Sequence, residues 1–197
     1  MPRGERRITR DDLIANEDYA LIRQTKRAEN VARKARRQLS VGPHVTVLFE
    51  CWESMWLQIQ DMLYIEKGGA AQIEDELRAY NPMVPNGREL TATLLFEIED
   101  PQQRHKILSS LGGVENHIYL QVGERRIKAM PEGDVERTNE AGKTSAVHFL
   151  HFPFSDGDIA AFRDLKTPVV FVIDHVNYGH MARLSNEMRQ ELANDFS

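Results

Sequence analysis

Two glutamates in matching sequence contexts are the first candidates for chemistry. Thr46–Glu50 reads TVLFE and Thr93–Glu97 reads TLLFE, so a predicted strand ends on a glutamate in both places. A helical stretch separates the two, which is the connection that joins parallel neighbours in a sheet. If these strands pair in parallel and in register, Glu50 and Glu97 lie side by side, where they share a proton or bind a hard cation. The alternative is that water solvates each carboxylate at its strand end.

Histidines form the second candidate set. The apolar strand predicted over 168–174 leads directly into His175, a common place for sites in α/β sheets. His148 and His151 share one predicted strand but point to opposite faces, so both cannot ligate one ion unless the strand bulges. Imidazole and carboxylate together suit zinc, iron or manganese. The alternative is that each is a satisfied core or edge histidine, since no spaced motif such as HExxH occurs. The candidate metal ligands or proton carriers are His148, His175, Glu50 and Glu97.

Other reaction types have less support. The chain has no G-x-S-x-G nucleophile motif, no P-loop and no G-x-G-x-x-G. Cys51 falls on the apolar face of a predicted strand and has no cationic neighbour in sequence, which is typical of a core residue. Trp52 and Trp56 are typical of helix packing, with a ligand pocket as the alternative. No defined reaction is therefore indicated.

Periodicity predicts the elements that must position these residues. Apolar residues at helical spacing predict helices, alternation predicts strands, and Gly or Pro clusters mark the breaks between them. Gly123-Glu124 predicts a tight turn joining two strands in a hairpin, and the polar stretch 131–143 predicts an exposed loop. The predicted helices start near Asp11 and cover 17–39, 53–63, a short stretch to Tyr80, 101–111, 155–165 and 185–193; the predicted strands cover 44–51, 90–98, 117–122, 125–130, 145–154 and 168–174.

This order predicts an α+β fold. We expect a mixed sheet of five or six strands, with helices inserted between the strands and packed mainly on one face. We expect residues 1–40 to form a basic helical segment packed on the domain, and residues 41–197 to form a single α+β domain. With 197 residues, the chain is long enough to bury a core without a disulfide or a structural metal.

Composition restricts the compartment and the partners. No apolar run reaches the roughly 20 residues that span a bilayer, and the charged N-terminus does not read as a secretory signal. A single cysteine excludes an internal disulfide, so we expect a cytoplasmic protein. Residues 1–40 carry a net charge of +5 and the remainder −10, so the basic end could meet an acidic partner, a nucleic acid or the rest of the chain. The aromatic residues that a single-strand binder interleaves are missing, which disfavours nucleic acid.

Several motifs resemble an uncharacterised bacterial family. In their order along nearly the whole chain they resemble the domain of unknown function DUF 3501. Asp61 stands where a glutamate is expected, Val176 where a proline is expected, and the extension before Thr9 is longer than usual. The motifs are LFE at 48–50, QIQDML at 58–63, DELRAYNP at 75–82, KTSAVHFL at 143–150 and IDH at 173–175.

The resemblance supplies context but no catalytic residues, because the family has no assigned activity. It implies companions of the rubrerythrin and iron–sulfur types, and hence iron, peroxide or oxidative-stress biology. The first hypothesis is therefore a metal-binding or redox-accessory protein. A non-catalytic protein-interaction module is the second, and an enzyme acting on a small molecule is the third.

Overall fold

The computed structural model describes residues 6–133 and 142–197. Part of the loop predicted over 131–143 lies outside these ranges. The elements are η1 (Arg10–Asp12), α1 (Asn16–Arg37), β1 (Gln38–Val41), β2 (Val45–Phe49), α2 (Trp52–Glu66), α3 (Gly69–Tyr80), η2 (Asn81–Met83), β3 (Glu89–Phe96), α4 (Pro101–Ser109), η3 (Val114–His117), β4 (Ile118–Val122), β5 (Arg125–Lys128), β6 (Met130–Pro131), β7 (Val147–Pro153), α5 (Asp156–Arg163), β8 (Val169–His175), β9 (Tyr178–Arg183), α6 (Asn186–Leu192) and η4 (Ala193–Asp195).

The strands form two antiparallel sheets. One has the order β1-β2-β3-β7-β6 and the other β5-β4-β8-β9. The α+β class is confirmed, and so is the hairpin β4–β5. The single mixed sheet is wrong, because the strands divide into two sheets and all their pairings are antiparallel. The connection from β2 to β3 holds two helices, α2 and α3. One helix would return the chain to the start of β2, whereas an outgoing and a returning helix bring it back to the end of β2, so β3 pairs antiparallel.

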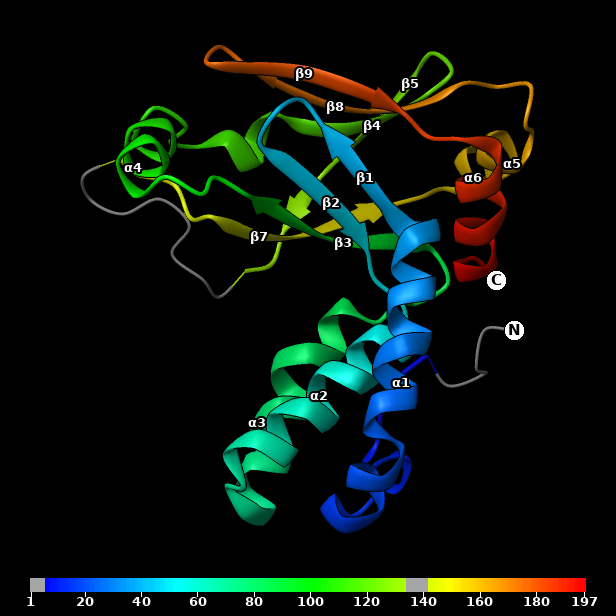
Figure 1. Ribbon diagram of the computed structural model, residues 1–197. Coiled ribbons are helices and arrows are strands. Elements are labelled where there is room, and N and C mark those ends of the chain that lie inside the picture. Colours follow the sequence, from blue (N-terminus) through cyan, green and yellow to red (C-terminus); the bar gives the residue numbers. More distant parts are fainter. Residues whose placement is uncertain (1–5, 134–141) are drawn as a thin grey trace.

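The main core lies between the two sheets (Figure 1). Alternate residues of each strand face inward, as on β3, where Leu90, Ala92 and Leu94 are fully buried. The ring of Phe171 on β8 meets Phe49 on β2 and Phe152 on β7, with centroid separations of 6.4 and 5.7 Å and edge-to-face geometry. Aromatic contacts across the interface therefore join the two sheets.

Helices α1, α2 and α3 extend from the outer side of the five-stranded sheet, away from the other sheet (Figure 1). A second apolar cluster lies between α2 and α3, where Met55, Ile59 and Leu63 of α2 meet Leu77 of α3. The side-chain amide of Gln60 fixes the segment before α1, since its oxygen accepts from the Ile14 amide at 2.8 Å. The start of α1 therefore lies against the second half of α2, where Asn16 contacts Leu63 and Tyr19 contacts Asp61. None of the described helices is long and apolar enough to cross a membrane.

The helix predicted over 17–39 ends two residues early. Gln38–Val41 forms β1, which pairs with β2 through a turn at Gly42. Gly42 has a φ of +70°, and a Cβ there would lie 2.6 Å from the ring of His180, so the turn requires glycine. Strand β9 is absent from the predicted elements because its sequence, YGHMAR, interrupts the apolar alternation at a sheet edge. The division into residues 1–40 and 41–197 stays a prediction.

Candidate functional site

Glu50 and Glu97 do not lie side by side. Because β2 and β3 are antiparallel, Val45 pairs with Phe96 and Phe49 with Ala92, which places the two glutamates at opposite ends of the strands. Glu50 is buried, and its carboxylate accepts from the hydroxyls of Ser54 and Thr93, both at 2.6 Å. Burial raises the pKa of Glu50. Glu97 is exposed and accepts from the Thr46 hydroxyl. The parallel pairing predicted for these residues is therefore wrong.

The two candidate histidines belong to different sheets. His148 on β7 is buried, and its Nε2 lies 3.0 Å from the carbonyl oxygen of Ser145 and 3.2 Å from the Thr144 hydroxyl. His175 ends β8, and its Nδ1 accepts from the Asn177 amide at 3.2 Å. Among the described residues, no group of three or more His, Cys, Asp or Glu side chains is placed to hold a metal ion. A metal site built from His148, His175, Glu50 and Glu97 stays a prediction of the sequence.

His151 joins two carboxylates on the outer face of the five-stranded sheet. Its Nδ1 lies 3.0 Å from Glu89 on β3, and its Nε2 lies 2.7 Å from Glu132, just after β6. The hydrogen bond with Glu89, supported by Glu132, raises the pKa of His151 against the opposing effect of burial. The imidazolium thus ties the short edge strand β6 to the centre of the sheet.

We predict that this cluster stabilises the protein in a pH-dependent way. The folded-state pKa of His151 is raised, so its contribution is full below the unfolded value of about 6.5 and is lost as pH rises through the folded value. Melting temperatures of wild type and His151→Gln between pH 5.5 and 9 should differ most at the acidic end. His105→Gln, on exposed α4, controls for unrelated effects. A gap that widens with pH would contradict the assignment.

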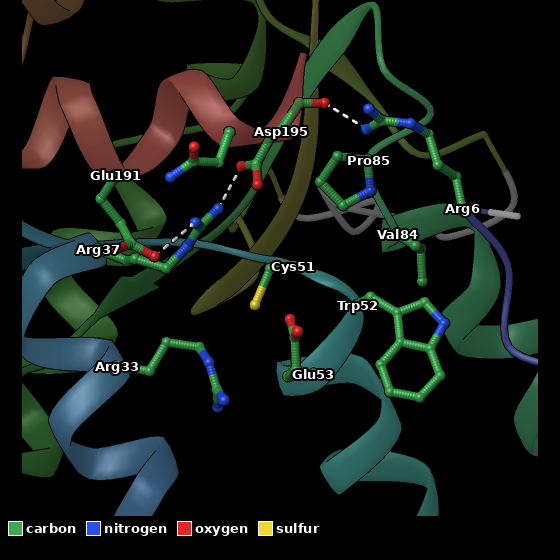
Figure 2. Close-up of a pocket in the computed structure, with 11 residues that line it drawn as sticks. Arg6, Arg33, Arg37, Cys51, Trp52, Glu53, Val84, Pro85, Glu191 and Asp195 are labelled. Carbon is green, nitrogen blue, oxygen red and sulfur yellow. Dashed lines mark hydrogen bonds and ion pairs between the residues drawn. The ribbon is translucent and has the colours of Figure 1, made fainter. Parts of the chain in front are cut away.

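A cavity with polar and charged walls lies where α1, the start of α2 and the C-terminal tail meet (Figure 2). It has a volume of about 240 Å³, and three arginines and three carboxylates are among its lining residues, so we name it the charged chamber. Figure 2 shows Cys51 and Glu53 near its middle, with Arg33 on the left, beside α1, and Arg6 and Trp52 on the right. It is lined by Arg6, Arg33, Arg37, Cys51, Trp52, Glu53, Val84, Pro85, Glu191, Asn194 and Asp195.

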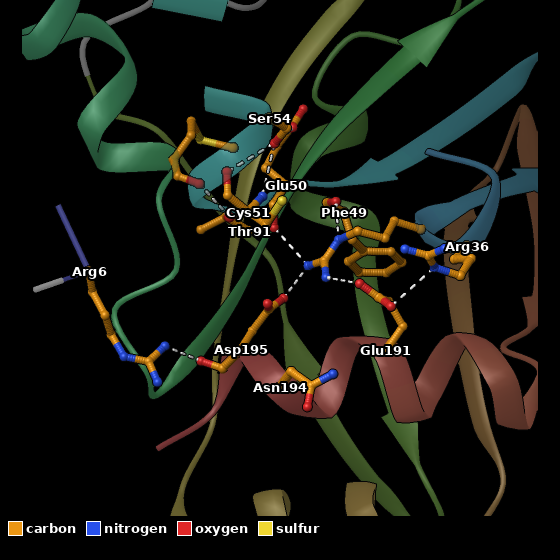
Figure 3. Close-up of polar contacts among 12 residues, drawn as sticks. Arg6, Arg36, Phe49, Glu50, Cys51, Ser54, Thr91, Glu191, Asn194 and Asp195 are labelled. Atoms are coloured by element: carbon orange, nitrogen blue, oxygen red, sulfur yellow. Dashed lines mark hydrogen bonds and ion pairs between the residues drawn. The ribbon is translucent and has the colours of Figure 1, made fainter. Parts of the chain in front are cut away.

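Arg37 fixes one wall of the charged chamber. Its guanidinium is buried and donates to the backbone carbonyls of Phe49 at 3.0 Å and Glu50 at 2.9 Å. It also pairs with Asp195 and, at 3.4 Å, with Glu191 (Figure 3). The end of α1 is thereby tied to both the end of β2 and the C-terminal helix. These contacts use four of the five N–H donors of Arg37 within the protein.

Burial controls the ionisation of the acidic groups on this wall. It raises the pKa of Asp195 to about 6, although the neighbouring Arg37 guanidinium acts in the opposite direction. It also raises the pKa of the Cys51 thiol, with Arg37 again opposing. A thiol with a raised pKa is protonated at neutral pH and is a poor nucleophile. The chamber therefore offers Cys51 as a neutral wall group.

Arg6 and Arg33 have donors to spare on the chamber walls. Arg33 donates to the side chain of Asn30 at 3.2 Å, and Arg6 donates to the backbone carbonyl of Asp195. Neither forms an ion pair with a carboxylate within residues 6–133 and 142–197. The first turn of α2 also lines the chamber through Trp52 and Glu53, and the N-terminal end of a helix favours an anion. Guanidinium groups match carboxylate and phosphate in geometry and charge.

A second cavity, of about 400 Å³, adjoins the charged chamber between α1 and α2. The two cavities share Arg33, Trp52 and Glu53 as lining residues. Because both tryptophans line the second cavity, we name it the indole chamber. Its lining residues are Asp11, Asp12, Ile14, Ile22, Lys26, Glu29, Arg33, Trp52, Glu53, Trp56 and Leu57.

The comparisons place the chain in a family. The family described as "Protein of unknown function (DUF3501)" matches residues 7–196. The chain belongs to this DUF3501 family. A solved structure from Burkholderia pseudomallei, titled as a novel protein of unknown function, has a TM-score of 0.89 and 38% sequence identity, and the match covers 96% of this chain and 99% of that one. No curated protein matches.

Sequence reasoning missed the chambers of this DUF3501 protein. The charge balance leaves open whether the basic residues of α1 meet an acidic partner, a nucleic acid or the rest of the chain. In the structure, Arg33 and Arg37 lie four residues apart on the face that meets α2 and α6. Trp52 and Trp56 have the same spacing on α2, and the ligand pocket that their pattern left as an alternative fits their positions. The signal that could have found the site is this pair of i, i+4 spacings on two neighbouring helices.

Proposed function

We propose that this DUF3501 protein is a binding protein for a small anionic metabolite, which it holds in the charged chamber without transforming it. One observation carries the proposal: Arg6 and Arg33 line a cavity of about 240 Å³ with guanidinium donors that no described carboxylate takes up. Arg37 keeps the cavity in shape, because its own donors are used by the protein. A phosphate or carboxylate fits the donors that remain.

Binding is favoured over catalysis by the state of the other wall groups. Cys51 has a raised pKa and is therefore not an activated thiolate. Asp195, whose pKa is raised to about 6, is already paired with Arg37 and is held on the wall of the chamber by that contact. The wall groups thus supply recognition, and they include no nucleophile paired with a base.

The test uses the intrinsic tryptophan fluorescence of this chain. Its two tryptophans, Trp52 and Trp56, both line the chambers, so intrinsic fluorescence reports on occupancy. We expect inorganic phosphate, used as a probe anion, to change the emission in a saturable way. Arg33→Gln should raise the dissociation constant about tenfold or more, since hydrogen bonds to charged groups contribute roughly 1.5–3 kcal/mol.

Lys34→Gln is the matched control. It removes the same charge from the adjacent position of α1, but Lys34 is exposed and does not line the charged chamber. Its dissociation constant for phosphate should stay within about twofold of the wild-type value, since an exposed charge outside the cavity is screened. If the dissociation constant for phosphate rose equally in both variants, phosphate would be attracted to the basic helix as a whole, and the proposal would be wrong.

The metal-binding or redox-accessory hypothesis rests on the resemblance. It proposes iron, zinc or manganese and a partner of the rubrerythrin or iron–sulfur type. The four candidate ligands each have protein partners, so the geometry favours the chambers instead. Elemental analysis of protein from iron- and zinc-replete cells, compared with a His148→Ala, His175→Ala double variant, tests this hypothesis directly.

The interaction-module hypothesis has one observation in its favour. Helix α1 leaves Leu21 and Val31 largely exposed, at 83% and 69% of their full areas. Exposed apolar side chains on a projecting helix are typical of contact surfaces when they form a patch. Co-purification at low and high salt tests for a partner, because charge-driven contacts with the basic end of α1 weaken as salt rises.

A further inference from the structure

The indole chamber differs in chemistry from the charged chamber beside it. Its apolar walls are Ile14, Ile22 and Leu57, together with the two indoles, whereas the charged chamber has only one of the indoles and is lined by three arginines. Its acidic lining residues outnumber its basic ones. The indole chamber therefore offers two indole rings and an excess of carboxylates beside a cavity lined by three arginines.

The indole rings are held in fixed orientations. Trp56 Nε1 donates to the backbone carbonyl of Asp12 at 2.8 Å, and Trp52 Nε1 donates to that of Arg7 at 3.2 Å. The two ring planes lie within 13° of each other, with centroids 6.4 Å apart. Tyr19 packs edge-on against Trp56, with a centroid distance of 6.1 Å, and supports it from α1. Rings anchored in this way line the chamber without having to be ordered by a ligand.

The carboxylates of the indole chamber make it suited to a positive group. Glu53 lies on the wall that both chambers share. It forms no ion pair with a basic side chain within residues 6–133 and 142–197. Asp11 lies at the rim, while the charge of Glu29 is offset by Lys26 at 2.9 Å. Indole faces attract cations through the ring quadrupole, and nearby carboxylates add a Coulombic attraction.

We propose that the indole chamber binds an organic ammonium group, so that the ligand of the whole site is a small zwitterion with an anionic head in the charged chamber. This inference rests on the proposed function for the position of the head. Arg33 and Glu53 line both chambers, so a guanidinium group and a carboxylate lie where the two cavities adjoin, within reach of the two charges of such a molecule. A simple anion would leave the indole faces and Glu53 unused.

The test compares fragments with the joined molecule by isothermal titration calorimetry. The probes are inorganic phosphate, choline, phosphocholine and glycine betaine, which carries a carboxylate in place of the phosphate. We expect phosphocholine or glycine betaine to bind at least about tenfold more tightly than either phosphate or choline, because a cation over an indole is worth up to roughly 2 kcal/mol when desolvated. Which of the two binds more tightly identifies the head group as phosphate or carboxylate.

Two variants locate the ammonium group. In Trp56→Leu and in Glu53→Gln, the ratio of phosphate to phosphocholine dissociation constants should fall to near one, with a thermal melt confirming that each variant is folded. Ile65→Leu, at an exposed position of α2 outside both chambers, should keep the wild-type ratio.

The outcomes separate the two proposals. If phosphate binds, and phosphocholine and glycine betaine bind no more tightly than phosphate, this inference is wrong and the proposed function is still supported. Choline that binds while phosphate does not would support the ammonium site and overturn the anion site. If none of the four probes binds, both proposals are wrong.

Discussion

Replacing Arg37 with methionine should lower the free energy of unfolding by about 3–5 kcal/mol, the cost of breaking a buried charge pair from one side. Only 3% of the Arg37 side chain is exposed. Its removal leaves Asp195 without its ion-pair partner and the carbonyls of Phe49 and Glu50 without a side-chain donor. Urea denaturation at pH 7.5 measures the loss.

Arg36→Met is the matched control for this prediction. Arg36 also pairs with Glu191, at 3.2 Å, but 60% of its side chain is exposed. Exposed ion pairs contribute about 0–1 kcal/mol, so this neighbouring variant should unfold almost as the wild type does. If both variants lost the same small amount, the Arg37 network would be no more than a surface contact.

The decrease in the free energy of unfolding caused by Arg37→Met should also depend on pH. Burial already raises the folded pKa of Asp195 to about 6, above the unfolded value of about 3.9. A group with a raised folded pKa loses its stabilising contribution as pH rises through that value. Without Arg37 the folded pKa rises further, so the variant should be least impaired near pH 5, where Asp195 is protonated, and most impaired above pH 7.

Arg37 also shows where sequence reasoning reaches its limit. Periodicity finds α1, and the dipole argument explains why basic residues gather in its last turns. It cannot find that one of these arginines turns inward, because its partners Glu191 and Asp195 lie more than 150 residues away. Charge pairing over such separations depends on tertiary structure, which a local pattern does not contain.

The elements were more predictable than their assembly. Helices α4, α5 and α6 and the hairpin β4–β5 follow from caps and turns: Asp100 caps α4 and Ser155 caps α5 through hydrogen bonds to the first-turn amides. Pairing direction was not predictable in the same way. The sequence predicts both helices between β2 and β3, but the antiparallel pairing follows from α3 packing beside α2 and bringing the chain back to the end of β2, which is a tertiary contact.

The chambers were missed for a related reason. An arginine or tryptophan at helical spacing has the same local sequence whether it faces solvent, a core or a cavity. The charged chamber needs α1, the start of α2 and the C-terminal tail at once, and these come from both ends of the chain. The site therefore depends on the assembled core. Because this core lies between the two sheets, the contact between the sheets is the feature to test.

Phe171→Ala should destabilise the whole protein by about 3–5 kcal/mol, the usual cost of deleting a buried aromatic side chain. Phe171 is fully buried and contacts Phe49 of β2 and Phe152 of β7 across the interface between the sheets. If one core supports both sheets, near-ultraviolet and far-ultraviolet circular dichroism should report a single urea transition at a lower midpoint.

Met181→Ala separates the loss of the interface from a general weakening of the four-stranded sheet. Met181 lies on β9 beside β8, and 71% of its side chain is exposed, so its truncation should change stability by less than about 0.5 kcal/mol. Two separate transitions in Phe171→Ala would mean that the sheets unfold independently. A single transition would mean that the two sheets unfold as one cooperative unit. Arg37 connects the charged chamber to the end of β2 and to Asp195 near the C-terminus, so the chamber walls would then unfold together with the core.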